Sequence, residues 1–168
     1  MNAAELRAVQ APLKDRYRAD PKAALVTLIA SGALDSAIAC KVETGRALAV
    51  AGLHPATGGS GAELCSGDML LEALVACAGV TMKAVATSMG IELRSGKIQA
   101  EGDIDFRGTL GVDKQAPVGF KAIRLTFELD ADAPQDKLDT LMKLTERYCV
   151  VLQTLRNSPT TEATLVRA

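Results

Sequence analysis

The sequence predicts one compact domain of mixed α and β structure, and three observations support this. The chain has 168 residues, which is a usual length for a single domain. Residues 67–89 are apolar almost throughout and end at a glycine, whereas residues 120–131 alternate between apolar and polar side chains. The first pattern is typical of a buried helix and the second of a strand.

The N-terminal part is expected to contain a helix followed by a β-meander. A helix is predicted over residues 3–18, started or interrupted near Pro12, and Asp20-Pro21 marks a turn. Three short apolar runs follow, AALVTLIAS, SAIACKVET and ALAVAG. Glycine and aspartate separate them, which favours strands, although alanine-rich runs also suit helices. The next segment, residues 53–66, is interpreted as a flexible connection because it lacks the lysine of a phosphate-binding loop.

Residues 67–89 form the clearest element of the sequence. Ser66 is expected to cap this helix, and Asp68 lies in the first turn, where a negative charge suits the helix dipole. Gly90 is expected to end it. Glu72 interrupts the apolar surface and is predicted to lie at a solvated edge. Many small side chains would let another backbone approach closely, so we interpret this segment as the central core helix.

The C-terminal half is predicted to contain two strands followed by two helices. Residues 95–108 and 120–131 both alternate and are expected to flank an exposed loop. Pro134 is a suitable start for a helix, and a second helical stretch follows at residues 149–157. The segment TTEATLV is predicted to be a last strand.

Composition excludes several classes of function. The net charge is −1, so the chain lacks the basic excess that general binding to nucleic acid or acidic membranes requires. Only 3% of residues are aromatic and there is no Trp, which disfavours base stacking. The N-terminus has no apolar signal core, and no continuous run of about 18 apolar residues occurs. We therefore predict a soluble, cytoplasmic protein with no membrane span and no nucleic-acid partner.

The cysteines carry the most chemistry. There are four, Cys40, Cys65, Cys77 and Cys149, with no C-x-x-C pair. In a reducing cytoplasm such thiols are either buried and inert or reactive and functional. Cys40 is expected to be an inert thiol on a strand, and Cys65 is expected to be exposed. A metal site made of Cys40, His54 and Cys65 is an alternative, although their spacing is irregular.

Four segments together resemble the OsmC/Ohr family, the osmotically induced and organic hydroperoxide resistance proteins. They are MLLEALVACAGVTMKAVA, GTLGVDKQAPVGF, FKAIRLTFEL and LMKLTERYCVVLQTLR, in that order. The resemblance covers roughly residues 24–166. It implies an OsmC-like α+β fold, with antiparallel β-sheets around a buried central helix, assembled as an intertwined homodimer. On this basis residues 1–23 are an N-terminal helical extension and residues 24–168 the OsmC-like domain.

The resemblance also implies a function, thiol-dependent reduction of organic hydroperoxides. Cys77 would attack the distal oxygen of the hydroperoxide and form a sulfenic acid, and Cys149 would resolve it as a disulfide. An external dithiol, such as a lipoyl group, would regenerate the pair, and no cofactor is implied. Because the thiolate is the nucleophile, Cys77 needs a nearby cation or oriented donors. A resolving thiol must also act before oxidation becomes irreversible.

The sequence departs from the family pattern at the residues that accompany the reactive thiol. Catalytic members carry an Arg after the first strand, where this chain reads SGALDS, and a Glu ten residues before the first Cys, where it has Gly67. Arg46 and Asp68 are the predicted substitutes. Many members have Pro after the second Cys, where Val150 stands here. Two alternatives therefore stay open: Cys65 as the resolving thiol, and a non-catalytic, small-molecule-binding or scaffold dimer.

Overall fold

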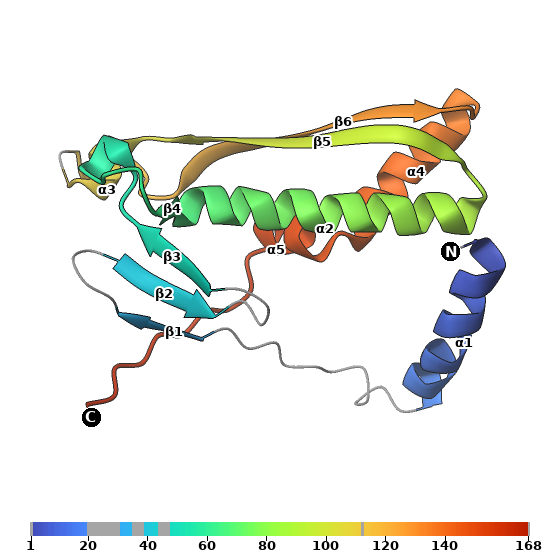
Figure 1. Ribbon diagram of the computed structural model, residues 1–168, viewed down its shortest axis with the longest axis horizontal. Helices are drawn as coiled ribbons and strands as arrows, with labels where there is room; N and C mark the ends of the chain where they lie inside the picture. Colours follow the sequence, from blue (N-terminus) through green and yellow to red (C-terminus); the bar gives the residue numbers. More distant parts are fainter. Residues whose placement is uncertain (1, 20–30, 35–38, 44–47, 112, 168) are drawn as a thin grey trace.

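The computed structural model describes residues 2–19, 31–34, 39–43, 48–111 and 113–167. Twelve elements are described, and Figure 1 shows their arrangement. In chain order they are α1 (Ala3–Ala19), β1 (Ser31–Leu34), β2 (Ala39–Glu43), β3 (Leu48–Gly52), η2 (Pro55–Thr57), β4 (Leu64–Cys65), α2 (Ser66–Met89), β5 (Leu93–Ile104), α3 (Phe106–Thr109), β6 (Phe120–Ala131), α4 (Gln135–Tyr148) and α5 (Val150–Arg156).

The strands form two separate sheets, which confirms the predicted α+β fold with antiparallel sheets. In the first sheet β1, β2 and β3 are antiparallel neighbours, and the two-residue β4 pairs with β3 in parallel. The predicted meander is therefore present, but its first strand differs. The segment SGAL, expected to belong to a turn, is β1, because it pairs with β2 from Ser31 to Leu34. Most of the run AALVTLIAS lies outside the described residues.

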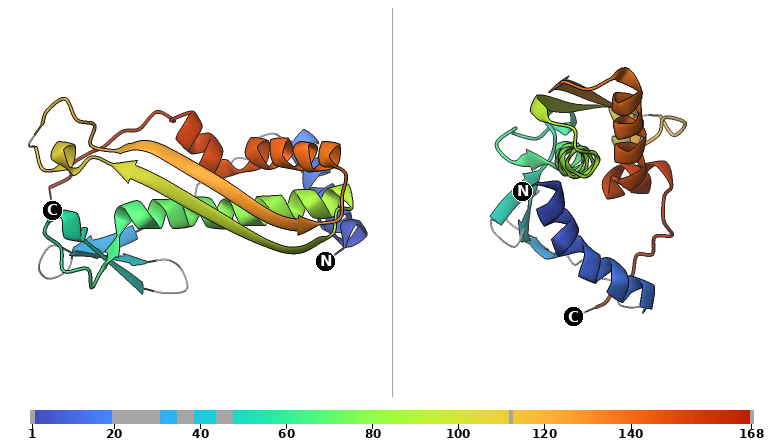
Figure 2. Two further views of the ribbon diagram at one scale, coloured as in Figure 1. Left: turned by 90° about the horizontal axis from the view of Figure 1, so that it is seen from above. Right: turned by 90° about the vertical axis from the view of Figure 1, so that its right-hand side faces the viewer.

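The second sheet is a two-stranded ribbon that lies along α2. Strands β5 and β6 pair over twelve residues each, and Figures 1 and 2 show the ribbon crossing over the helix. Its outer face carries ion pairs, such as Arg94 with Asp130 and Arg124 with Asp103. At the end of the ribbon where β5 meets Phe120 of β6, the close pairing of the two strands requires a glycine, Gly102. A Cβ atom on Gly102 would lie 2.3 Å from the ring of Phe120.

Helix α2 runs through the middle of the fold, as expected. Its buried residues, Leu74, Ala78, Met82 and Ala86, recur every four positions and form one stripe. Gly90 ends the helix in the left-handed region, at a φ of 67°. The predicted cap is wrong by one residue. The N-cap is Cys65, and its side chain makes no capping hydrogen bond. Ser66 is already helical because β4 leads directly into the helix.

The buried side chains form two clusters along α2. One contains Met82, Ala86, Ile91 and Leu141, and residues of β6 and α4 pack against it. The other contains Leu74, Ala78 and Cys149, and apolar residues of β5, β6 and α5 surround it. The second cluster therefore buries a thiol among aliphatic groups.

By length and composition alone α2 is long and apolar enough to cross a membrane, which the absence of a continuous apolar run does not reveal. The same properties are typical of the central helix of a folded domain. Here α2 packs against β5, α4 and α5, which accounts for its apolar character. Only 22% of its most apolar window is buried within the chain, so much of its surface lacks an intramolecular neighbour. Glu72 is exposed, as predicted.

The strand predicted over residues 95–108 is present as β5, but its end differs, and one other C-terminal prediction is wrong. The predicted strand through residues 95–108 ends at Ile104, and the next residues form the short helix α3, because the Asp105 side chain accepts a hydrogen bond from the Arg107 amide and caps the turn. The segment TTEATLV has no regular structure, since it pairs with none of the described strands and is exposed throughout. The helices at Gln135–Tyr148 and Val150–Arg156 confirm the other two predictions.

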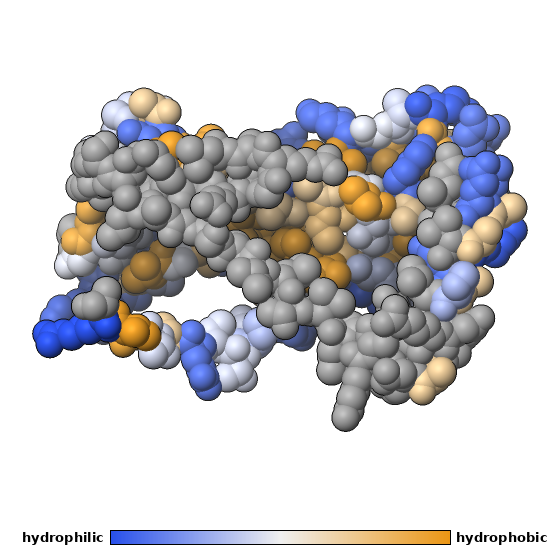
Figure 3. Space-filling view, turned by 60° about the horizontal axis from the view of Figure 1, so that its bottom comes forward, coloured by the Kyte–Doolittle hydropathy of each residue, from blue (hydrophilic) through white to orange (hydrophobic). Residues whose placement is uncertain are grey.

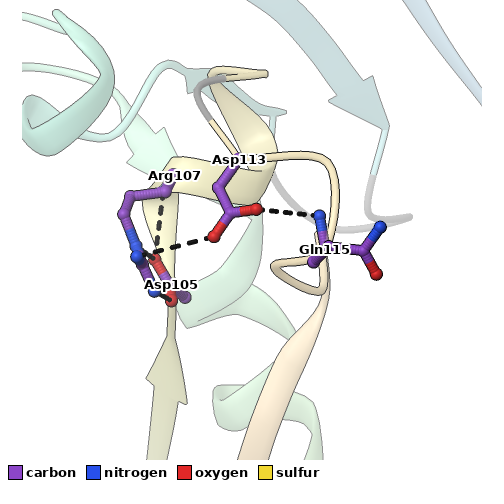
Figure 4. A network of polar contacts seen from close by, with 4 residues as sticks. All are labelled: Asp105, Arg107, Asp113 and Gln115. Carbon is purple, nitrogen blue, oxygen red and sulfur yellow. Dashed lines mark hydrogen bonds and ion pairs between the residues drawn. The ribbon is translucent and has the colours of Figure 1, made fainter.

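The loop between β5 and β6 is held by a polar network. Arg107 pairs with Asp105 at 2.7 Å and with Asp113 at 3.5 Å, and Asp113 in turn accepts a hydrogen bond from the Gln115 amide (Figure 4). The pairing with Arg107 lowers the pKa of Asp105 to about 2. The carboxylate therefore stays charged at all physiological pH values.

Candidate active site

Two cysteines from distant parts of the sequence meet in the second core cluster. Cys77 lies in the middle of α2, and Cys149 lies between α4 and α5. Cys149 is fully buried, with 0% of its surface exposed, whereas Cys77 is half-buried. Both are free thiols, and the two side chains lie within hydrogen-bonding reach of each other. A reagent from solvent would therefore meet Cys77 first.

The break between α4 and α5 creates polar groups next to this thiol. Cys149 is the C-cap of α4 and the N-cap of α5, with extended backbone angles of φ −71° and ψ 105°. Its own amide still donates to the Thr145 carbonyl at 3.0 Å. The amides of Val150 and Val151 begin α5, so they have no acceptor within that helix. Both amides donate hydrogen bonds toward the sulfur of Cys77, which lowers the pKa of this thiol.

These contacts make the Cys77 thiol unusually acidic. Burial, the largest single cause, raises its pKa. Hydrogen bonds lower it, and together they outweigh burial, so that the pKa lies below the ordinary value. The donors are the backbone amides of Val151 and Val150 and the side chains of Cys149 and Thr81. All of these groups are neutral donors. The need for oriented donors around the thiolate is thus met by amides and hydroxyl or thiol groups.

Cys149 has the opposite character. Burial raises its pKa most, and the hydrogen bond and negative charge of Cys77 raise it further, whereas hydrogen bonds from the amides of Leu152 and Val151 lower it in part. Of the two thiols Cys77 therefore ionises first, and Cys149 keeps its proton to higher pH and can donate it to the sulfur of Cys77.

This asymmetry predicts a difference in alkylation as a function of pH. Because only the thiolate reacts, the rate for Cys77 should rise with pH and level off above its lowered pKa. Cys149 should react only at higher pH or after unfolding. Peptide mass spectrometry after iodoacetamide treatment of the reduced protein at pH 6 to 10 measures both rates. The same protein in urea is the control. Equal pH midpoints for Cys77 in the folded and unfolded protein would contradict the assignment.

A groove of about 610 Å³, lined by apolar and neutral polar residues, lies between α2 and α4. Residues of α2, including Val80 and Thr81, form one wall, and Leu144 and Tyr148 of α4 form another. Its lining residues are all uncharged. Thr81 and Tyr148 each lie next to the thiol pair, one helical turn after Cys77 and one residue before Cys149. The groove is therefore an uncharged hollow next to residues that neighbour the two cysteines, although neither cysteine lines it.

Of the other two predicted site residues only Asp68 lies in the described part of the chain, and it is not brought to Cys77 there. Asp68 is exposed and lies nine residues earlier on the same helix, about 13 Å along its axis. It lines a different pocket, together with His54 and Cys65. Arg46 lies outside the described residues. Their predicted roles as substitutes for the family's Glu and Arg stay predictions.

The alternative roles of the remaining cysteines find little support in the described part of the chain. Cys65 is half-buried in β4 and is the N-cap of α2, twelve residues before Cys77. His54 stacks on Phe106, and its Nδ1 accepts a hydrogen bond from the Ala56 amide. Among the described side chains no group of three could hold a metal ion. Cys40 lies on β2, as expected, but its side chain is outside the described part.

Sequence reasoning missed three groups of this site, Thr81 and the amides of Val150 and Val151. The signal for Thr81 was present, because a residue four positions after Cys77 lies on the same helix face. The amides could not be found from the sequence. They depend on a helix break at Cys149 that no Pro or Gly announces.

Two thiols with opposite pKa shifts, packed together in the core of an α+β fold, make up the candidate site. The sequence model of the family described as OsmC-like protein matches residues 59–164, so the chain belongs to the OsmC-like protein family. No curated relative matches the sequence.

Solved structures share the fold. An OsmC-like protein from Mycoplasma pneumoniae aligns with a TM-score of 0.66 at 15% identity, over 79% of this chain and 89% of that chain. An organic hydroperoxide resistance protein from Legionella pneumophila aligns with a TM-score of 0.62 at 17% identity, over 79% and 91%. The organic hydroperoxide resistance protein OhrB of Bacillus subtilis aligns with a TM-score of 0.52 at 18% identity, over 79% and 93%. At these identities the likeness concerns the fold.

Proposed function

We propose that this protein is a thiol-dependent peroxidase that reduces organic hydroperoxides, with Cys77 as the nucleophile and Cys149 as the resolving thiol. The observation that carries the proposal is the asymmetry of the pair: the pKa of the half-buried thiol is lowered, and the pKa of the fully buried thiol is raised. A peroxidatic thiol must be ionised and reachable, whereas a resolving thiol must be close and protected until needed.

The chemistry balances in three steps. The Cys77 thiolate attacks the distal oxygen of the hydroperoxide, the O–O bond breaks, and the departing alkoxide takes up a proton to become an alcohol. The sulfur of Cys149 then attacks the Cys77 sulfenic acid, which forms the disulfide and releases water. An external dithiol finally reduces the disulfide to two thiols and is itself oxidised.

The coupling between the thiols favours this order of events. Besides burial, the hydrogen bond and charge of the Cys77 thiolate raise the pKa of Cys149. Both of these contributions disappear when Cys77 becomes a neutral sulfenic acid. Cys149 then loses a proton more easily, at the moment when its thiolate is required. The pair thus keeps the second thiol unreactive until the first has been oxidised.

The uncharged groove supports an apolar substrate rather than hydrogen peroxide. An alkyl or aryl group would bury apolar surface there, which hydrogen peroxide cannot do. We expect the reduced protein to consume cumene hydroperoxide at least about tenfold faster than hydrogen peroxide, given about 25 cal/mol per Å² of buried apolar surface. Stopped-flow measurement with one equivalent of each oxidant tests this. Failure to consume either oxidant would contradict the proposal.

A second candidate is a non-catalytic member of the fold that binds a small molecule or serves as a scaffold dimer. The observation that favours it is the distance from Cys77 to Asp68 on the same helix, together with the neutral character of every donor that lowers the Cys77 pKa. It predicts that an apolar ligand binds the groove while the thiols stay reduced in excess cumene hydroperoxide. Under the peroxidase proposal, Asp68 acts on Cys77 only from a second subunit.

The homodimer is part of the same proposal. Leu70, Ala73, Ala76 and Val80 of α2 are exposed in the single chain, and Val80 is exposed to 73%. Figure 3 shows hydrophobic residues gathered in the middle of the face that is turned away from the β5–β6 ribbon. An exposed apolar helix face of this kind is typical of a surface that a second subunit covers.

A charged substitution on this face should therefore separate the subunits. Ala73→Arg places a guanidinium in the expected interface but leaves the fold of the chain unchanged, because Ala73 is exposed. Multi-angle light scattering at micromolar concentration should report a dimer for the native protein and a monomer for Ala73→Arg. The matched control is Thr126→Arg, on the exposed face of β6. A native protein that is monomeric would contradict the dimer.

A further inference from the structure

Strand β6 contains a bulge at Lys121. The pairing with β5 passes directly from Ala122 to Phe120, so Lys121 is an extra residue without a partner on β5. In a regular strand, residues three positions apart point to opposite faces, but Phe120 and Ile123 are both partly buried and line the same pocket. Lys121 lines this pocket with them. The bulge therefore places a charged side chain beside the apolar face of the ribbon.

The pocket has a volume of about 360 Å³ and lies between β6 and α5. Ile123, Leu125 and Phe127 of β6 form one apolar wall, and Leu152 and Leu155 of α5 form another. All five side chains also pack against the second core cluster, so the core fixes both walls in place. Preformed, mostly apolar pockets of about 300–1,000 Å³ are typical of small-molecule sites.

The pocket also has three charged lining residues, Lys121, Glu146 and Arg156. Glu146 and Arg156 form an ion pair at 3.0 Å, which joins α4 to α5 across the helix break. Because this pair is neutral as a unit, the lining has a surplus of one positive charge, and this charge is that of Lys121.

Lys121 is not neutralised by the carboxylates on the neighbouring part of the ribbon. Asp103 and Asp105 each have a lowered pKa, chiefly through side-chain hydrogen bonds from Arg124 and Arg107, and the charge of Lys121 contributes at longer range. These carboxylates thus already have guanidinium partners. In the part of the chain that the structure describes, the Lys121 ammonium makes no ion pair or hydrogen bond of its own. It is therefore available to an anion.

We propose that this pocket binds a small apolar carboxylic acid, with the hydrocarbon part between β6 and α5 and the carboxylate paired with Lys121. Burial against the apolar walls stabilises the hydrocarbon part, and the surplus positive charge selects an anion over a neutral or cationic molecule of the same length. The inference does not depend on the proposed function, because neither cysteine lines the pocket.

Calorimetric titration of the reduced protein with octanoate, below its micellar concentration, tests the ligand class. Octanol and octylamine have the same chain length with a neutral and a cationic head, and acetate supplies the carboxylate alone. We expect octanoate to bind at one site per chain, about fivefold more tightly than octanol and at least about tenfold more tightly than octylamine or acetate. Raised salt should weaken octanoate but not octanol.

Variants of Lys121 test the position of the site. Lys121→Met removes the charge on an exposed side chain, Lys121→Arg restores it, and Lys97→Met, exposed on β5 and outside the pocket lining, is the matched control. Octanoate should bind about fivefold more weakly to Lys121→Met and at nearly the native affinity to the other two, with octanol binding unchanged throughout. Absence of octanoate binding to the native protein, or equal binding by the native protein and Lys121→Met, would overturn the inference.

Discussion

Replacement of Cys77 by Ser is expected to abolish hydroperoxide consumption. The hydroxyl of Ser is not ionised at neutral pH, so the amides of Val150 and Val151 have no thiolate to stabilise. The rate of cumene hydroperoxide reduction should fall at least about a thousandfold, as is common when a nucleophile is removed. Consumption is followed in the presence of an excess of dithiol. The matched control is Cys65→Ser, since Cys65 is half-buried in another part of the fold.

A Cys77→Ser protein that consumes the oxidant as fast as the native protein would remove the catalytic assignment. A large loss of hydroperoxide reduction in Cys65→Ser would instead indicate that Cys65 takes part in turnover. Circular dichroism of both variants separates these outcomes from unfolding. The substitution at Cys77 is conservative in size, so the core around Leu74 and Ala78 should keep its packing.

Replacement of Cys149 by Ser is expected to preserve the first turnover and to damage the later ones. The Ser hydroxyl still donates to the Cys77 thiolate, so the first equivalent of hydroperoxide should react at nearly the native rate. The sulfenic acid then has no resolving partner, and excess oxidant converts it to sulfinic acid. Steady-state turnover with a lipoyl-type dithiol should fall on the order of tenfold or more, because direct reduction of the sulfenic acid replaces disulfide exchange.

Mass spectrometry of the Cys149→Ser protein measures this outcome directly. Cys77 should gain two oxygen atoms in excess oxidant, whereas the native protein should form a disulfide and resist further oxidation. Full turnover in Cys149→Ser, with no irreversible oxidation of Cys77, would show that another thiol resolves the intermediate. Cys65 is the alternative that the sequence suggests, and the double variant with Cys65→Ser would identify it.

Much of the fold followed from local patterns. The apolar segment before Gly90 predicted α2, and the alternation of residues 120–131 predicted β6, because each element buries one face at its own period. Errors arose where tertiary pairing decided the structure. SGAL has turn-like residues but pairs with β2, and TTEATLV has strand-like residues but no strand beside it in the described chain.

The candidate site could be predicted only in part. Cys77 and Cys149 were recognised from the family resemblance, and their proximity in the core agrees with that pairing. The donors were not predicted, because the free amides arise from the backbone at the α4–α5 break. Asp68 lies on the same helix as Cys77, nine residues earlier, so its role stays a prediction that the fold of the single chain does not test.

The central claim, that Cys77 and Cys149 act as one redox pair, is tested most directly by mapping disulfides after oxidation. The reduced protein receives one equivalent of cumene hydroperoxide, remaining thiols are blocked, and peptides are analysed without reduction. We predict a single intramolecular disulfide between Cys77 and Cys149, with Cys40 and Cys65 recovered as blocked thiols. Recovery of all four cysteines as thiols, or a disulfide that excludes Cys77, would contradict it.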